Sequence, residues 1–239
     1  LRVLPGLYPD RLEKVTEYSV KLLLGRWQTL WIQVSGDEIP PGQHELKITF
    51  WADQNKRDIV AETVFHLQVI NASLPQQKLI YTNWFHADCL ASLYDCAVFS
   101  ERHWQLIARY VRLAARHGMN MILTPCFTPP LDTEVGGERL TVQLVTIEKK
   151  GDSYSFDFSL LDRWVELCQS QGIRFFEHAH LFSQWGAEHA PKIVAQVDGC
   201  EQKIFGWETD AGGSDYCIFI RQYLQALRDH LQAKGLFNL

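Results

Sequence analysis

The residues best suited to chemistry follow short apolar segments that are typical of strands. Trp84, His86 and Asp88 come at the end of the apolar segment 79–85. The end of a strand is where α/β proteins bind their ligands, and these three side chain types can stack on a ligand or hydrogen-bond to it. The simpler alternative is a His–Asp pair that only stabilises a turn of the loop.

A second and richer group follows the apolar segment 173–177. Glu177, Gln184 and Trp185 suit a sugar, because a carboxylate and an amide bind hydroxyl groups while an indole covers the face of the ring. His178 and His180 should lie on one side of an extended chain, since side chains alternate, and such a pair could bind a metal ion as in amidohydrolases. Those enzymes carry the motif on their first strand, whereas here it follows the third. An aromatic-rich packed loop is the remaining interpretation.

Two further groups carry weaker signals. The stretch 124–133 contains Pro129 and Pro130, which fix its backbone, so a rigid structural loop is the favoured interpretation. Glu208 and Asp210 could form a catalytic carboxylate pair, but they precede a predicted helix, where Asp210 could serve as a cap.

The elements that must position these groups alternate between strands and helices. Apolar segments at 79–85, 119–124 and 173–177 predict strands, and each is followed by a long loop and then by an amphipathic helix: 100–117, 159–168 and 216–234. A glycine closes each helix, and the next strand follows within one or two residues. We also expect a hairpin around 150–152. This order predicts the first three units of a (β/α)8 TIM-type barrel, with a doubly wound open sheet as the alternative.

The first part of the chain follows a different period. Residues 26–34, 44–50 and 62–69 alternate apolar with polar side chains and are separated by turn signals, which predicts a partial antiparallel β-sandwich. The fold class is therefore α/β plus β, with a sandwich domain at 1–75 and a barrel domain at 79–239. Both ends look cut, and we expect further strands upstream of Leu1 and a fourth barrel strand after Leu236.

Composition excludes some classes of function. The net charge of −5 provides no basic surface for nucleic acid or an anionic membrane, and no apolar run reaches the roughly 20 residues of a membrane helix. The 8 Trp mildly favour a carbohydrate site. The 6 cysteines show no CxxC pair, so we interpret them as mostly buried free thiols in a reducing compartment. Together with the lack of a visible signal peptide, this predicts a cytoplasmic protein.

Four stretches together resemble the bacterial glycoside hydrolases of family 123 and the related domain-of-unknown-function 4091 proteins: 81–88, 120–125, 128–133 and 182–187. The likeness covers most of the chain. It implies exo-acting hydrolysis of β-linked N-acetylgalactosaminides or related hexosaminides with retention, in which the acetamido oxygen of the substrate attacks the anomeric carbon. It also implies an Asp that orients the acetamido group, an adjacent Glu that acts as general acid/base, and no metal or organic cofactor.

One departure from the family is decisive. The adjacent Asp-Glu pair that the resemblance implies at the end of the fourth barrel strand has no counterpart here, since the one Asp-Glu is Asp37-Glu38 in the first domain. No catalytic residue is therefore assigned, and the pair is expected beyond Leu239. As residues of the substrate pocket, the resemblance implies Trp84, His86, Glu177, His180, Gln184 and Trp185. The expected partner is an oligosaccharide or glycoconjugate substrate, and the oligomeric state stays open. A non-catalytic carbohydrate-binding protein and a metal-dependent hydrolase using His178 and His180 are the alternatives.

Overall fold

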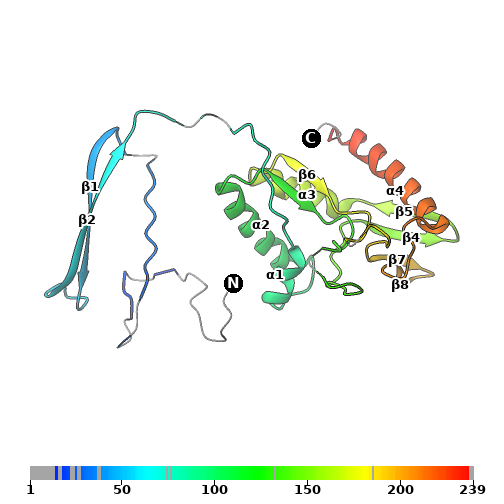
Figure 1. The fold of residues 1–239 in the computed structure, drawn as a ribbon, viewed down its shortest axis with the longest axis horizontal. Coiled ribbons are helices and arrows are strands. Elements are labelled where there is room, and N and C mark those ends of the chain that lie inside the picture. Colours follow the sequence, from blue (N-terminus) through cyan, green and yellow to red (C-terminus); the bar gives the residue numbers. More distant parts are fainter. Residues whose placement is uncertain are drawn as a thin grey trace. The chain divides into compact units, whose positions relative to one another are not determined.

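The structure is a computed structural model that describes residues 14–15, 18–21, 25, 28–36, 39–73, 75, 77–131, 133–184 and 186–236 (Figure 1). The chain divides into two compact units, Leu1–Gln76 and Gln77–Leu239. Within the described ranges the architecture is mixed α/β, with three small sheets and four helices, and no closed barrel is seen. No described helix is long and apolar enough to cross a membrane.

The first unit contains an antiparallel hairpin of β1 (Gly42–Trp51) and β2 (Ile59–Val69). Both strands were predicted from their alternating side chains. The prediction of a strand at 26–34 is wrong for its described part, because residues 28–34 have no strand structure. An alternating segment becomes a strand only where a neighbour accepts its backbone hydrogen bonds, and no described residue pairs with this one. The sandwich as a whole stays a prediction.

The second unit is built on three parallel segments. Thr82 bridges Met121 in parallel, and β3 (Met121–Thr124) pairs in parallel with β6 (Phe175–His178). Of the strand predicted at 79–85, only Thr82 is paired, through this single bridge. Three helices lie between these segments and after them, as the sequence predicted: α2 (Glu101–Arg116), α3 (Ser159–Ser170) and α4 (Ser214–Ala233). A short helix, α1 (Ala87–Leu93), was not predicted.

Local sequence explains where these helices begin and end. The hydroxyl of Ser100 accepts a hydrogen bond of 3.3 Å from the backbone N–H of His103, which caps α2 as predicted. Gly118 follows α2 with φ of +91°, and Gly172 follows α3 with φ of +103°. Glycine adopts this left-handed conformation without strain, so the chain can turn at once into β3 and β6. The inner face of α2 is buried: Trp104, Leu106, Ile107 and Val111.

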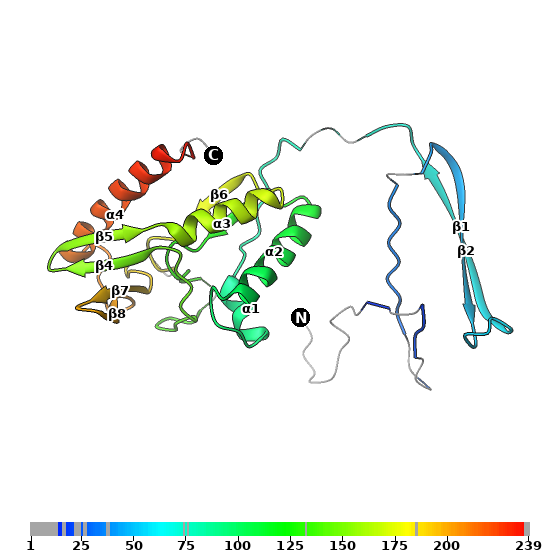
Figure 2. The same cartoon turned by 180° about the vertical axis from the view of Figure 1, so that it is seen from behind.

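The two long loops of the second unit form a sheet of their own. The first contains β4 (Thr146–Lys150) and β5 (Ser153–Asp157), which confirms the predicted hairpin. The second contains β7 (Ile193–Val197) and β8 (Cys200–Phe205), a hairpin that the sequence analysis missed. Strands β4 and β7 pair in parallel, so the order is β5-β4-β7-β8, and α4 packs along β5 (Figure 2). The two loops are therefore structured insertions that pair with each other through β4 and β7.

The aromatic side chains largely serve the core of the second unit. Trp104 and Trp164 are at most 2% exposed, and Phe127, Phe219 and Tyr223 pack against one another. These tryptophans are not available to a sugar, so the number of Trp in the sequence overstated the carbohydrate signal. The prediction of mostly buried cysteines is wrong for three of the six, which are exposed: Cys89, Cys200 and Cys217.

Candidate functional site

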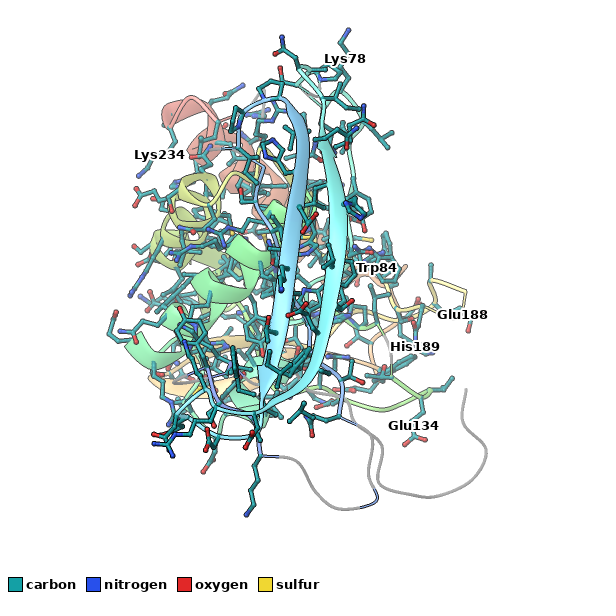
Figure 3. The ribbon with its side chains drawn as sticks, turned by 90° about the vertical axis from the view of Figure 1, so that its left-hand side faces the viewer. Lys78, Trp84, Glu134, Glu188, His189 and Lys234 are labelled. Atoms are coloured by element: carbon teal, nitrogen blue, oxygen red, sulfur yellow. The ribbon has the colours of Figure 1, made fainter. Side chains whose placement is uncertain are left out.

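The candidate residues lie in the loops that follow the three parallel segments. Because parallel strands end at the same edge of their sheet, the loops 82–89, 124–133 and 177–190 begin at one edge. Figure 3 shows Trp84, Glu188 and His189 on one side of the second unit and Lys234, at the end of α4, on the other. The strand register is thus consistent with the predicted (β/α) units.

Alternation of side chains places Thr82 and Glu177 on the same face. Thr82 pairs with Met121, and Glu177 pairs with Leu123, so these residues point to one side of the three segments. The amide of Asn83 donates to the hydroxyl of Tyr81 at 2.6 Å, which shows that the odd-numbered residues before Trp84 share the opposite side. Trp84 lies beyond this bridge, and its place is given by its contact with His180.

The indole of Trp84 meets the imidazole of His180 edge-on, with the ring centroids 5.4 Å apart and an angle of 84° between the planes. This contact joins the first loop to the third. Trp84 is still 47% exposed. An exposed indole that is held by a neighbouring ring is a suitable platform for a sugar.

Several buried polar atoms in this region have no hydrogen-bond partner among the described residues. They include Thr82 Oγ1, Glu177 Oε2 and His180 Nδ1, all from the first and third loops or the residues just before them. A buried polar atom without a partner costs free energy, so such atoms are uncommon in folded proteins. Their occurrence at one edge of the sheet indicates a site for a polar ligand.

Asp88 forms an ion pair with Arg139, a residue that the sequence analysis missed. Arg139 Nε and Nη2 donate to the two carboxylate oxygens at 2.8 and 3.1 Å, and both side chains are 11% exposed. Asp88 was predicted to bind substrate, but here its carboxylate is held by a bidentate ion pair. The spacing of 51 residues between the partners gave no sequence signal for this pair.

Arg139 also contacts the other loops. Its Nη1 donates to the carbonyl of Leu131 at 3.2 Å, and its own carbonyl accepts from Lys192 Nζ at 3.3 Å. Gln184, another predicted ligand residue, donates to the carbonyl of Thr133 at 2.8 Å and so joins the third loop to the second. Asp88 and Gln184 thus hold the loops in place, while Trp84 and Glu177 stay open.

A network of charges continues from this region. Glu138 contacts Lys192 at 3.2 Å and Lys203 at 2.7 Å, and hydrogen bonding from Lys203 is the main reason why the pKa of Glu138 is lowered. Lys203 also contacts Glu208 at 3.1 Å. Asp210 accepts from the backbone N–H of Gly212 at 2.8 Å, as expected of a turn residue. Glu208 and Asp210 therefore have structural partners and do not form an open carboxylate pair.

The remaining predicted residues have separate surroundings. His86 is half-buried and occupies the N-cap position of α1. Trp185, which the resemblance also implies as a pocket residue, lies outside the described residues.

His178 and His180 do not act as a pair. His178 Nε2 and the hydroxyl of Tyr223 are 2.5 Å apart, and the ring packs against Phe127 in the core. Burial raises the pKa of Tyr223 well above its ordinary value, which keeps this hydroxyl protonated as the donor. His180 instead contacts Trp84. The prediction that both imidazoles share one side is wrong, because β6 ends at His178 and alternation stops there.

No metal-binding group supports the alternative of a metal-dependent hydrolase. In the part of the chain that the structure describes, no three His, Cys, Asp or Glu side chains gather as ligands of an ion would.

A cavity of about 280 Å³ lies elsewhere, lined by residues that include Phe99, Gln143 and Gln196. The amide of Gln143 is fully engaged with the backbone of Val145 and Val194. None of the described residues that line this cavity has a buried polar atom without a partner. The strand-end loops are therefore the better candidate for a polar ligand.

Comparison with known protein families identifies the part of the chain that contains the candidate residues. Residues 84–239, about two thirds of the sequence, match the family model described as glycoside hydrolase 123, catalytic domain. The match begins at Trp84, within the first loop, and includes the other two loops. No curated protein matches the chain. With its strand-end loops inside the matched region, the chain belongs to the glycoside hydrolase 123 family.

Proposed function

We propose that this chain carries the sugar-binding part of a glycoside hydrolase that cleaves β-linked N-acetylgalactosaminides or related hexosaminides. The observation that carries the proposal is the exposed Trp84, held by His180, together with the unpartnered Oε2 of Glu177 three residues before that histidine, within the matched catalytic domain. The order of three parallel segments with helices between them supports three units of a (β/α)8 barrel, with the site at the strand ends.

The proposed reaction is retaining and assisted by the substrate. The acetamido oxygen attacks the anomeric carbon, and the resulting positive charge is stabilised by a carboxylate that also orients the acetamido group. A neighbouring carboxylic acid gives its proton to the leaving oxygen and later takes one from water. The sequence contains one Asp-Glu pair, Asp37-Glu38, in the first unit and outside the described residues. This pair is not the catalytic one in the proposal. The carboxylate that orients the acetamido group and the neighbouring acid are assigned to a segment outside this chain.

The role of this chain is to hold the sugar. A pyranose presents C–H groups on its faces and hydroxyl groups around its edge, so it needs an aromatic platform and polar groups beside it. Trp84 supplies the platform, and Glu177 and His180 supply the polar atoms. The ion pair of Asp88 with Arg139 keeps the loops in register before the sugar binds, which reduces the entropic cost of binding.

Ligand-observed NMR of the whole 239-residue chain with N-acetylgalactosamine tests this proposal. We expect saturation transfer to the sugar, and we expect Trp84→Ala to weaken binding about tenfold or more through loss of the stacking surface. Trp31→Ala is the matched control, because Trp31 is 75% exposed and belongs to the first unit. Equal binding by the Trp84→Ala variant would contradict the proposal. We expect no turnover of a chromogenic N-acetylgalactosaminide by this chain alone.

A further inference from the structure

The solvent-facing side of α2 carries cations without neighbouring acids. Four arginines of this helix are exposed: Arg102, Arg109, Arg112 and Arg116. With 3.6 residues in a turn, they fall within an arc of about 80°, opposite the buried face of the helix. None of the four forms an ion pair with a described residue. The one acid of the helix, Glu101, is held by Arg163 at 2.7 Å.

The basic surface continues past the end of α2. The side chain of Gln77 donates to the carbonyl of Gly118 at 3.0 Å, and its own carbonyl accepts from Arg174 at 3.3 Å. Lys78 and Arg174 therefore lie near the end of the helix, and both are exposed. We call the four arginines of α2, with Lys78 and Arg174, the basic stripe. The net charge of −5 averages over the whole chain and conceals this local excess of cations.

The arrangement of the stripe does not favour the helix itself. Arg109 and Arg112 are three positions apart and Arg112 and Arg116 four, so like charges face each other on neighbouring turns, which destabilises a helix. Arg102 stands in the first turn, where the positive end of the helix dipole repels a cation. Helix α4, by contrast, places Asp229 beside one of its arginines. A face whose charges oppose the stability of its own helix indicates a binding surface.

The spacing and composition of the stripe favour a flexible anionic chain as its partner. Arg102, Arg109 and Arg116 are seven residues apart, so they follow one line along α2 at intervals of about 10.5 Å. A guanidinium group binds a carboxylate or a similar oxyanion through paired hydrogen bonds. The one exposed large apolar side chain of α2 is Leu113. Interfaces with proteins or membranes need more apolar surface, whereas a glycan with regularly repeated acidic groups does not.

We propose that the basic stripe is a docking site for a linear anionic glycan that carries sulfate or uronic acid groups. The stripe contains no residue of the strand-end loops, so this inference goes beyond the proposed function and adds a second glycan-binding surface.

Binding of heparin to the whole 239-residue chain tests the proposal, because heparin is a sulfated glycan without N-acetylgalactosamine. We expect the fluorescence anisotropy of labelled heparin to show binding that weakens as salt is added, and labelled neutral dextran to show none. The variant Arg109→Gln/Arg116→Gln should bind heparin about tenfold or more weakly, through the loss of two charge-assisted contacts.

The matched control is Arg221→Gln/Arg228→Gln, which removes the same charge from exposed positions of α4. Its affinity for heparin should stay within about twofold of the wild type. The thermal midpoint of Arg109→Gln/Arg116→Gln should stay level or rise, because like-charge contacts are removed. Equal losses of affinity in the two variants, or no binding by the wild type, would overturn the proposal. A lower midpoint with unchanged heparin binding would assign the two arginines a structural role instead.

Competition separates a glycan from other acidic partners. At equal concentrations of negative charge, dextran sulfate should displace labelled heparin. Poly-glutamate and duplex DNA should displace it about tenfold less well, because neither repeats its charges with the spacing of the stripe on a flexible chain. Displacement by either as effective as that by dextran sulfate would show that the partner is not a glycan.

The outcomes also separate this inference from the proposed function. Arg109→Gln/Arg116→Gln should keep the affinity of the wild type for N-acetylgalactosamine. If the wild-type chain binds heparin but not N-acetylgalactosamine, the proposed function fails and the stripe stands. If it binds N-acetylgalactosamine but not heparin, the stripe alone fails.

Discussion

At the scale of single residues, Arg139 is the side chain on which the geometry of the site most depends. It joins Asp88 of α1 to the carbonyl of Leu131 in the second loop. Arg139→Ala leaves the Asp88 carboxylate, 11% exposed, without its partner, and we expect the free energy of unfolding to fall by about 3 kcal/mol. Urea unfolding followed by tryptophan fluorescence measures this change.

The matched control for Arg139 is a surface pair. Arg228 and Asp229 are about half exposed, so Arg228→Ala should cost less than about 1 kcal/mol. The double variant Arg139→Ala with Asp88→Ala should cost less than the sum of the two single changes, because it leaves no unpaired charge. An Arg139→Ala variant that unfolds at the same urea concentration as the wild type would show that the ion pair does not hold the loops.

Individual candidate residues could be predicted from the sequence only in part. The position of Trp84 and Glu177 at strand ends followed from apolar segments and their alternation. The roles of Asp88 and Gln184 could not, because each contacts a residue 51 positions away, and nothing in a single sequence indicates such a pair. The position of His178 was misjudged because the regular alternation ends with its strand.

At the scale of the elements, α3 and α4 are joined by one charged cluster. Asp162 on α3 contacts His230 on α4 and Lys234 directly after it, each at 2.7 Å. Burial opposes ionisation of Asp162, but the hydrogen bonds from Lys234 and His230 outweigh it, so its pKa lies below the ordinary value. Because α4 also covers His178 through Tyr223, this contact supports the helix behind the site.

A carboxyl group whose pKa is lower in the folded state stabilises the fold above its unfolded pKa, about 3.9, and loses this effect as the pH falls through the folded pKa. We therefore expect the wild type to be more stable than Asp162→Asn above about pH 5, with the difference shrinking as the pH falls below about 3.9. Chemical unfolding of both proteins from pH 6 to pH 2.5 measures it. A difference that stays constant over this range would contradict the assigned ion pair.

The elements differ in how well the sequence predicted them. The three long helices were predicted because caps such as Ser100 and closing glycines such as Gly118 act locally. The hairpin of β7 and β8 was missed, although Asp198-Gly199 between two segments rich in β-branched or polar residues is a known turn signal. Pairing of β4 with β7 could not be predicted, because it depends on contacts between two insertions.

At the scale of the whole molecule, the sequence predicted the alternation of strands and helices better than the assembly of the sheets. The first unit shows why. Its strands β1 and β2 were predicted, yet apolar side chains such as Val60 and Phe65 remain exposed, and the alternating segment 28–34 has no strand structure. Alternation indicates that a segment can pair, but the partner that it needs decides whether it does. The sandwich and the closed barrel remain predictions for this reason.

An amide chemical-shift map of the whole chain, titrated with N-acetylgalactosamine, tests most directly the claim that the sugar binds at the strand ends. We predict that the largest shifts occur in residues 82–89 and 177–184, with smaller shifts in 124–131, and that the hairpin of β1 and β2 is unaffected. Shifts centred on the cavity beside Phe99, Gln143 and Gln196, or no shifts at all, would contradict the account.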